Sequence, residues 1–452
     1  MRFTQVTLVH ALVLGVLSGS LSAQSKTLTL DQAIETALQR NIDVLQAQNN
    51  VESAQGRALS AHGNYLPSLS ASAGWRRAQN DRPGNSSVFL SDGTVIPGSS
   101  GFSVTNQFST GIDASYTIFD GFRREAGLNQ ATSNAVAAEQ RAVRTRQAIV
   151  FQAEQAYINV LRNEQLVKVS EENLKRDRRQ LERITEANRV GSLSLADVYR
   201  QQSVVAADEL RLITDQNNYD KAKADLAALI GLDPFEEYEF ADATLSTEIQ
   251  QSDLDSSIEL YKNLPALTQR ALSARPDYIE ADESYQAAES GVSAARSGYV
   301  PTVSAFAGYS LSDQRVSNLS DNKNISWGLS LRWNLFDGFQ REEALQSAAA
   351  QKRNAEVSLK QTERSISVEV KKALLDIDAA RKAYDVSQKG LTSATEDRKI
   401  AEERYNLGAG TLLDLLIANA GLVQAEADRV NASYNFIIAK RNVEYVLGER
   451  TY

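Results

Sequence analysis

The 452-residue sequence contains no cysteine and only two histidines. Without cysteine it can form no disulfide and no thiolate metal site, and it has neither a thiol nucleophile nor an attachment point for an N-terminal lipid. His10 and His62 stand far apart in the sequence. We also find no nucleophile–base constellation, so the sequence gives no support for an envelope hydrolase. We therefore expect no enzyme activity, no cofactor and no resident metal ion.

Long apolar runs are missing after the first residues. The apolar run from Leu8 to Leu17 follows one positive charge, Arg2, and leads into small residues up to Ala23. This pattern predicts a secretory signal peptide over residues 1–23. No later run reaches the roughly 18 residues of a membrane-spanning helix, so a mature chain that enters a membrane must do so as strands.

The chain carries a modest excess of acidic residues. Lys and Arg total 48 and Asp and Glu total 57, which gives a formal net charge of −9. A weakly acidic protein has no general electrostatic attraction for nucleic acid. We therefore expect no nucleic-acid partner.

Two long stretches, residues 122–189 and 339–406, contain no proline and only one internal glycine each, Gly127 and Gly390. They are rich in Ala, Gln, Glu, Lys and Arg, which cost little in a helix. Each predicts one helix roughly 100 Å long. Apolar residues recur every seven positions, as in coiled coils. They are Ala153, Val160, Val167, Leu174 and Leu181 in the first stretch, and Val370, Ile377, Tyr384 and Leu391 in the second.

Four stretches alternate apolar with small polar residues, at about 66–77, 104–120, 300–313 and 324–337. An apolar outer face, a polar inner face and aromatic girdles are typical of outer-membrane β-barrels. An ordinary sheet on a soluble core is the alternative, but it would need a facing apolar layer that the heptad helices do not offer. We predict a girdle of Trp75, Tyr116, Trp327 and Trp333.

Four strands are too few to close a barrel, because the smallest such barrels have eight. An open sheet edge in lipid leaves backbone groups unsatisfied. The sequence therefore predicts an obligate oligomer in which each copy gives four strands to a shared barrel.

The second half of the chain repeats the first, which predicts two units, 24–231 and 265–452, around an acidic segment at 232–264. Each unit reads helix–strand–strand–long helix–short helix. Phe-Asp-Gly-Phe occurs at 119–122 and again at 336–339, an offset of 336 − 119 = 217 that continues into both helix turns. We expect Asp120 to cap the first long helix. The two long helices are thus expected to be equal in length.

These duplicated features resemble the TolC-type outer-membrane efflux proteins. The segments Arg189–Val198 and Tyr405–Asp414 are similar to that family's helix-turn tips. The resemblance implies a mainly α fold with a membrane β-barrel portion: a homotrimer whose twelve-stranded barrel continues into a long α-helical tunnel. Residues 232–264 would form an equatorial belt around it.

The resemblance also implies location and partners. The channel-tunnel would lie in the outer-membrane lipid, span into the periplasm, and export small molecules such as drugs, or a secreted polypeptide. Its partners would be a periplasmic adaptor and an inner-membrane pump, either proton-driven or of the ABC type. The alternative is a periplasmic coiled-coil adaptor or structural protein without a pore, which the alternating strands disfavour.

Candidate site residues follow from the same resemblance. The predicted adaptor-docking tips are Val190, Gly191, Ser192 and Leu193 on one hairpin and Leu407, Gly408, Ala409 and Gly410 on the other.

The predicted periplasmic gate uses Tyr405, Asp197 and Asp414, where three copies of Asp414 would form a carboxylate ring with at least one raised pKa. Gly410 and Ile417 stand where the family has an arginine and a second ring aspartate. Both aspartates can alternatively serve only to stabilise a helix start.

Overall fold

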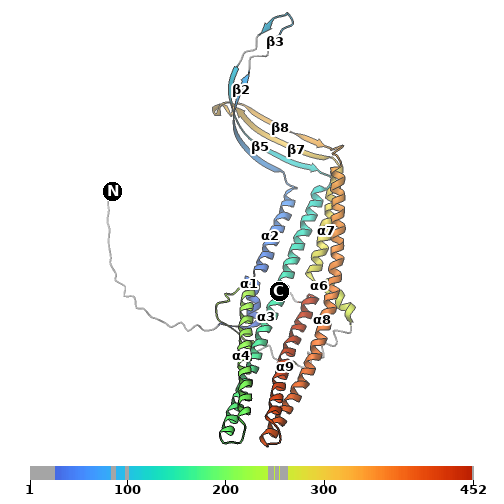
Figure 1. Cartoon of the computed structure of the whole chain (residues 1–452). Helices are drawn as coiled ribbons and strands as arrows, with labels where there is room; N and C mark the ends of the chain where they lie inside the picture. Colours follow the sequence, from blue (N-terminus) through green and yellow to red (C-terminus); the bar gives the residue numbers. More distant parts are fainter. Residues whose placement is uncertain are drawn as a thin grey trace, which may run out of the picture.

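The computed structural model describes residues 26–82, 88–96, 101–242, 249, 254 and 263–449. The predicted signal peptide at 1–23 lies outside the described residues, as does most of the acidic segment 232–264. A curved sheet sits at one end of a set of long helices, and two helical turns form the opposite end (Figure 1). Within the described part of the chain, no helix combines the length and apolar character needed to cross a membrane.

Two helices of 67 residues each, α3 (Arg123–Arg189) and α8 (Gln340–Asn406), run through the molecule. Most heptad positions predicted to pack are buried, with Val160 and Val370 at 0% and 1% exposure, whereas Leu181 and Leu391 are half-buried. The shorter helices are α1 (Leu30–Arg40), α2 (Ile42–Gly63), α4 (Leu195–Leu229), α6 (Leu264–Ala274), α7 (Pro276–Arg296) and α9 (Leu412–Leu447), with short 3₁₀ turns η2 (Ser297–Tyr299) and η3 (Val316–Asn318).

The helices stand side by side in one layer. Near the sheet the contacts run in the order α2–α3–α7–α8, and toward the tips they run α4–α3–α9–α8. Helix α2 leads into β2 (Ser68–Arg82), β5 (Gly101–Phe119) into α3, α7 into β7 (Thr302–Asp313) and β8 (Lys323–Arg332) into α8. Sheet and helices therefore share one lateral order.

The sheet is antiparallel with the order β2–β5–β7–β8. Its register places apolar residues opposite one another, for example Trp327 beside Ala307, Ala307 beside Ala114, and Ala114 beside Leu69. This face remains open: Trp327 is 82% and Leu69 75% exposed. The packed soluble core of the alternative interpretation is therefore not seen against these strands.

The last strand is shorter than predicted. It ends at Arg332 rather than near residue 337, so Trp333 lies just beyond it. Arg332 is opposite Thr302, and the residue before Thr302 is Pro301, which has no N–H to continue the ladder. The indole Nε1 of Trp333 instead donates to the backbone oxygen of Tyr299 at 3.3 Å.

Four further short strands fall where the sequence showed no pattern. Strand β6 (Tyr238–Phe240), inside the acidic segment, pairs in parallel with β1 (Lys26–Leu28). The buried Tyr157 hydroxyl of α3 donates to the Leu28 oxygen at 2.9 Å. This contact ties strand β1 to the middle of the long helix α3. A small hairpin of β3 (Val88–Phe89) and β4 (Val95–Ile96) lies between β2 and β5.

Each Phe-Asp-Gly-Phe motif forms a left-handed turn that aims the long helix. Gly121 and Phe122 have φ values of 69° and 64°, and the second repeat adopts the same conformation. Asp120 Oδ1 accepts the backbone N–H of Arg123 at 3.1 Å, as expected for a side chain that satisfies a free N–H of the helix, although Phe122 occupies the N-cap position itself. Arg124 then donates back to the Ile118 oxygen at 3.1 Å, locking strand to helix.

The two turns can be compared by the same glycine-to-alanine substitution, because only the first turn has no room for an added β-carbon. A β-carbon at Gly121 would lie 2.0 Å from Val300 Cγ2, whereas one at Gly338 would meet nothing within 4 Å. Both alanine variants carry left-handed strain of about 1–2 kcal/mol. We expect Gly121→Ala to destabilise the protein clearly more than Gly338→Ala in denaturant titrations. If both variants lost the same free energy of unfolding, the Val300 side chain would be able to move away from the added β-carbon at little cost.

Candidate functional site

The two helical hairpins reverse at neighbouring tips, α3/α4 and α8/α9, at the end farthest from the sheet (Figure 1). Gly191 and Gly408 adopt φ values of 80° and 69°, which glycine accepts without strain. Beyond them, the N–H groups of Ser192 and Ala409 bond back to the preceding helices at 2.9 and 2.8 Å. Such ends satisfy the last carbonyls of a helix and stop it abruptly.

The tips present apolar side chains to solvent. Val190 and Leu407, the first residues beyond each long helix, are 71% and 82% exposed. Ser192, Ala409 and the other tip residues surround them, with Leu193 and Gly410 half-buried. An exposed apolar side chain on a well-ordered helix turn offers a surface that a partner helix can cover. The docking role of the tips stays a prediction.

Asp414 completes a capping box at the start of α9. Its Oδ2 accepts the backbone N–H and the hydroxyl of Thr411 at 2.9 and 2.7 Å, and the Thr411 hydroxyl accepts the N–H of Asp414 at 3.2 Å. These hydrogen bonds to the charged form lower the pKa of Asp414, with the nearby Arg404 cation adding to the effect. In one protomer Asp414 therefore stabilises a helix start, and a raised pKa would require the other copies.

Tyr405 and Asp197 lie close to each other across the two hairpins. Burial, and next the negative charge of Asp197, raise the pKa of the Tyr405 hydroxyl. The ring packs against the cluster of Ile184, Val198 and Leu412, all buried. The Asp197 carboxylate accepts from Ser194 Oγ at 2.7 Å and from Arg200 Nη1 at 3.1 Å, so a direct Tyr405–Asp197 contact stays a prediction.

The sequence reasoning missed three cations near these gate residues. Arg200 Nη1 donates to Asp197 Oδ1 at 3.1 Å. Arg183 is close enough to Tyr405 to lower its pKa, against the larger raising effects, and Arg404 acts on Asp414. Glycine stands at 410, where the family has its arginine, yet positive charge is still present at the tips. Two sequence signals were available: Arg404 directly precedes Tyr405, and Arg200 follows Asp197 by three residues.

A buried polar seam joins α3 to α4, which the sequence reasoning also missed. Asp177, 2% exposed, accepts the Gln201 amide at 3.2 Å, and Asp208 follows Gln201 by seven residues. Burial first, then the hydrogen bond and charge of Asp177, raise the pKa of Asp208 to about 7. The equivalent positions of α9, at an offset of 217, are Ala418 and Ala425. The second hairpin therefore has no counterpart of this Gln201–Asp208 pair at the two equivalent positions.

This seam predicts pH-dependent hairpin stability. The folded pKa of Asp208 is raised above its unfolded value near 3.8, so its stabilising contribution is present below pH 4 and lost as pH rises through about 7. Arg211 and Arg176 face the pair and moderate the loss. We expect faster hydrogen exchange in α4 at pH 8.5 than at pH 5.5, after correction for intrinsic rates.

The substitution Asp208→Asn should remove this pH dependence, because an amide cannot ionise yet can still donate to Asp177. Asp220→Asn, on an exposed face of the same helix, is the matched control and should keep it. The same pH response in both variants would rule out Asp208 as its origin.

The predicted girdle residues are exposed on the apolar face of the sheet or just beyond it. Trp75 stacks on Phe108 of the neighbouring strand with ring centres 6.4 Å apart, at the end away from the helices. Tyr116 lies nearer the helices, with the Arg124 guanidinium 5.9 Å from its ring centre. Trp327 and Trp333, six residues apart, are separated by about 20 Å of chain. These aromatic residues therefore lie at more than one height along the strands, measured from the helices.

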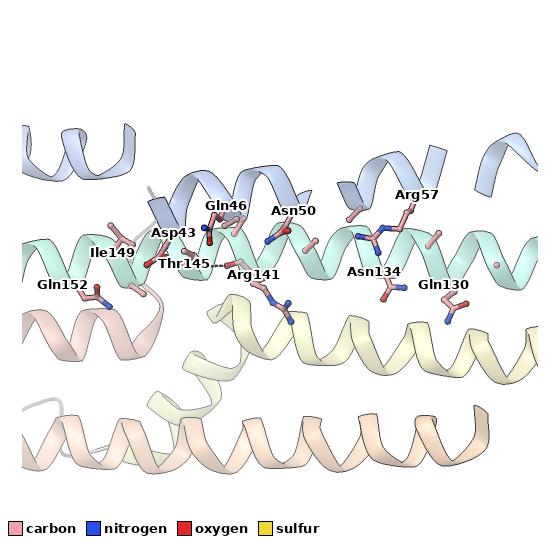
Figure 2. Close-up of a pocket in the computed structure, with 17 residues that line it drawn as sticks. Asp43, Gln46, Asn50, Arg57, Gln130, Asn134, Arg141, Thr145, Ile149 and Gln152 are labelled. Atoms are coloured by element: carbon pink, nitrogen blue, oxygen red, sulfur yellow. Dashed lines mark hydrogen bonds between the residues drawn. The ribbon is translucent and has the colours of Figure 1, made fainter. Parts of the chain in front are cut away.

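A groove of about 850 Å³ runs between α2 and α3 (Figure 2). Amide side chains dominate its labelled lining, including Gln46, Asn50, Gln130 and Asn134. Arg141, at its edge, donates through Nε to Glu280 of α7 at 2.8 Å. The groove is open, is lined by small apolar as well as polar residues, and carries no nucleophile–base pair among them, so it resembles a seam between two helices and not a catalytic pocket.

Comparison with known proteins decides the family. The family model described as "Outer membrane efflux protein" matches residues 33–232 and 267–449. The chain belongs to this family. It is therefore an outer-membrane efflux channel protein of the TolC type that extends into the periplasm, and it transports and does not catalyse. The pore-less adaptor considered as an alternative is thereby excluded.

Individual members of the family can be aligned with this chain over most of their length. The chain is 25% identical over 400 residues to the pyoverdine export outer membrane protein OpmQ of Pseudomonas aeruginosa, covering 88% of this chain and 80% of that one. It is 25% identical over 377 residues to TolC of Escherichia coli K12, covering 75% and 74%. The Campylobacter jejuni CmeC outer membrane channel has the same fold, with a TM-score of 0.77, 19% identity and coverage of 98% and 94%.

Proposed function

We propose that three copies of this chain form one closed channel, with 3 × 4 = 12 strands in the outer membrane and a continuous helical tunnel below. The observation that carries the proposal is the order of the strands in the sheet, which leaves an open edge on each side. The four-stranded sheet begins at β2 and ends at β8, and neither edge is paired within the described residues. Unpaired edges in lipid are too costly to leave open, and a partner copy is the available occupant.

The helices support the same arrangement. Helix α8 stands at the end of both helical rows, and exposed apolar residues recur along it at intervals of 7, 11 or 14 positions. Such spacings keep residues on one face of a helix. These residues are Val357, Val368, Leu375, Val386 and Ile400. Helix α4, at the opposite end of the lower row, exposes Leu195, Tyr199, Leu210 and Ile213.

Packing of α8 against the next copy would bury this stripe against α2 near the membrane and α4 near the tips. The same rotation would bring β8 beside the next β2. One interface repeated by rotation would therefore pair the strand edges and bury the exposed apolar helix faces at the same time, as expected of a cyclic oligomer.

TolC-type channels act with a periplasmic adaptor and an inner-membrane pump, and we propose that the tips carry this contact here. The exposed Val190 and Leu407 on fixed turns are suited to a helical-hairpin partner. The cargo is a small molecule or a secreted polypeptide; the relative OpmQ is a pyoverdine export protein.

The proposal is tested with the full mature chain purified in detergent and fused into planar bilayers. We expect native mass spectrometry to give three chains, and single-channel recording to give discrete steps. A folded monomer with full strand content that never conducts would overturn the proposal.

A further inference from the structure

The inward face of the sheet is almost free of charge. In the described strands, the inward positions 68–74, 109–117, 302–312 and 324–330 hold Ser, Thr, Gly or Asn, with two exceptions, Asp113 and Phe306. Arg76 and Arg332 lie on the same face only at its outer and inner ends. The Asp113 carboxylate and the Phe306 ring are therefore surrounded on this face by small, uncharged residues.

These two side chains are seated in notches made by glycine. A β-carbon at Gly308, opposite Asp113, would lie 2.8 Å from Asp113 Oδ1 and 3.2 Å from Ser326 Oγ. A β-carbon at Gly328, opposite Phe306, would lie 3.0 Å from the ring at Cζ. The carboxylate and the ring thus lie against the wall in space that any other residue would fill, which fixes their positions.

The two notches are adjacent. Asp113 pairs with Gly308, and the next inward pair along the same two strands is Ser115 with Phe306. Asp113 and Phe306 are therefore diagonal cross-strand neighbours, a relation that places side chains about 7–8 Å apart. That spacing suits a molecule with one positive charge and an apolar or aromatic body, because cations are attracted to carboxylates and to aromatic faces.

We propose that Asp113 and Phe306 form a binding subsite for lipophilic organic cations in the lumen of the β-barrel. This inference rests on the proposed trimeric channel, in which three such pairs form a carboxylate ring beside a phenyl ring. Twelve strands enclose more space than the eight that side chains fill, so the ring lines an open passage. Fixed negative charge on such a wall concentrates cations locally.

The test uses the full-length channel in planar bilayers with potassium chloride. Tetraphenylphosphonium is added on the extracellular side, so that it reaches the barrel without crossing the periplasmic mouth. We expect it to block the current, and Asp113→Asn to weaken the apparent affinity about tenfold, since wall charge can concentrate ions 10-fold or more. Asp113→Asn should also shift the reversal potential under a salt gradient toward anion permeation.

Phe306→Ala separates the two parts of the subsite. It should weaken tetraphenylphosphonium block while leaving the reversal potential unchanged, because it removes the ring and not the charge. Asp92→Asn, in the turn between β3 and β4, is the matched control and should alter neither quantity. Repeating the comparison in an Asp414→Asn background removes any contribution of the periplasmic carboxylates.

The outcomes distinguish this inference from the proposed function. If wild type conducts and Asp113→Asn leaves both block and reversal potential unchanged, the subsite is wrong while the channel stands. Equal block by the anion tetraphenylborate would also contradict it. If wild type forms no conducting trimer, the proposed function fails, and the subsite with it.

Discussion

Replacing Leu329 with arginine should sharply reduce the amount of assembled channel in the outer membrane. Leu329 lies on the apolar face of β8, opposite Ala305, and is 71% exposed in one protomer. On the proposed lipid-facing surface, a charge near the bilayer midplane costs about 2–4 kcal/mol per chain. Heat-resistant trimer on semi-native gels, measured in isolated outer membranes, gives the yield.

The control is the next residue along the strand. Ser330 is opposite Ser304 on the inward face, so Ser330→Arg places the same charge in water and should be tolerated. Because side chains alternate between faces, neighbouring positions test the register directly. Equal tolerance of both substitutions would show that either the register or the membrane assignment is wrong.

Gly408→Trp should abolish export while leaving the trimer and the barrel intact. Gly408 has a φ of 69°, and a β-carbon there would meet nothing within 4 Å, so the added ring projects from the tip. If the tips carry the adaptor contact, a bulky side chain blocks docking. Export is measured as retention of a fluorescent pump substrate by living cells, and assembly as trimer on gels.

Backbone strain must be separated from lost docking in this experiment. Gly93, between β3 and β4, has a φ of 83° and equally open surroundings, so Gly93→Trp carries the same left-handed strain far from the tips. We expect Gly93→Trp to export normally. Normal export by Gly408→Trp would remove this turn from the docking surface.

The regular part of this fold could be predicted from local patterns. Proline-free stretches with heptad spacing predicted the helices, and Phe-Asp-Gly-Phe predicted where they begin, because helix propensity and capping act within a few residues. Alternation predicted which residues share the apolar face of the sheet and which share the polar face. The end of β8 could also have been predicted, since Pro301 limits the partner strand.

The remaining features depend on contacts between distant segments. Three-residue strands β1 and β6 have no period to detect and pair across more than 200 residues. A register shift between Thr117 and Phe119 interrupts the alternation that the sequence indicated through Ile118. Nothing in the sequence spacing sets Asp177 and Asp208 apart from the other charges on these helices, because the packing of α4 on α3 is what brings them together. Repeat symmetry offered one clue, since alanine occupies the position equivalent to Asp208.

The central claim is that the β2 edge of one copy pairs with the β8 edge of the next. The chain has no native cysteine, so engineered cysteines can be read without background. Single cysteines at Leu69, Ala71 or Ala73 on β2 are combined with one at Ile325, Trp327 or Leu329 on β8, and the outer membranes are oxidised. Disulfides form only where α-carbons approach within about 7 Å.

The account predicts that at least one edge pair gives covalent dimers and trimers on denaturing gels. The control pair, Ala114→Cys with Ala307→Cys, faces across β5 and β7 within one chain and should close as a monomer. Monomers alone from every edge pair, with the control pair fully oxidised, would contradict the shared barrel.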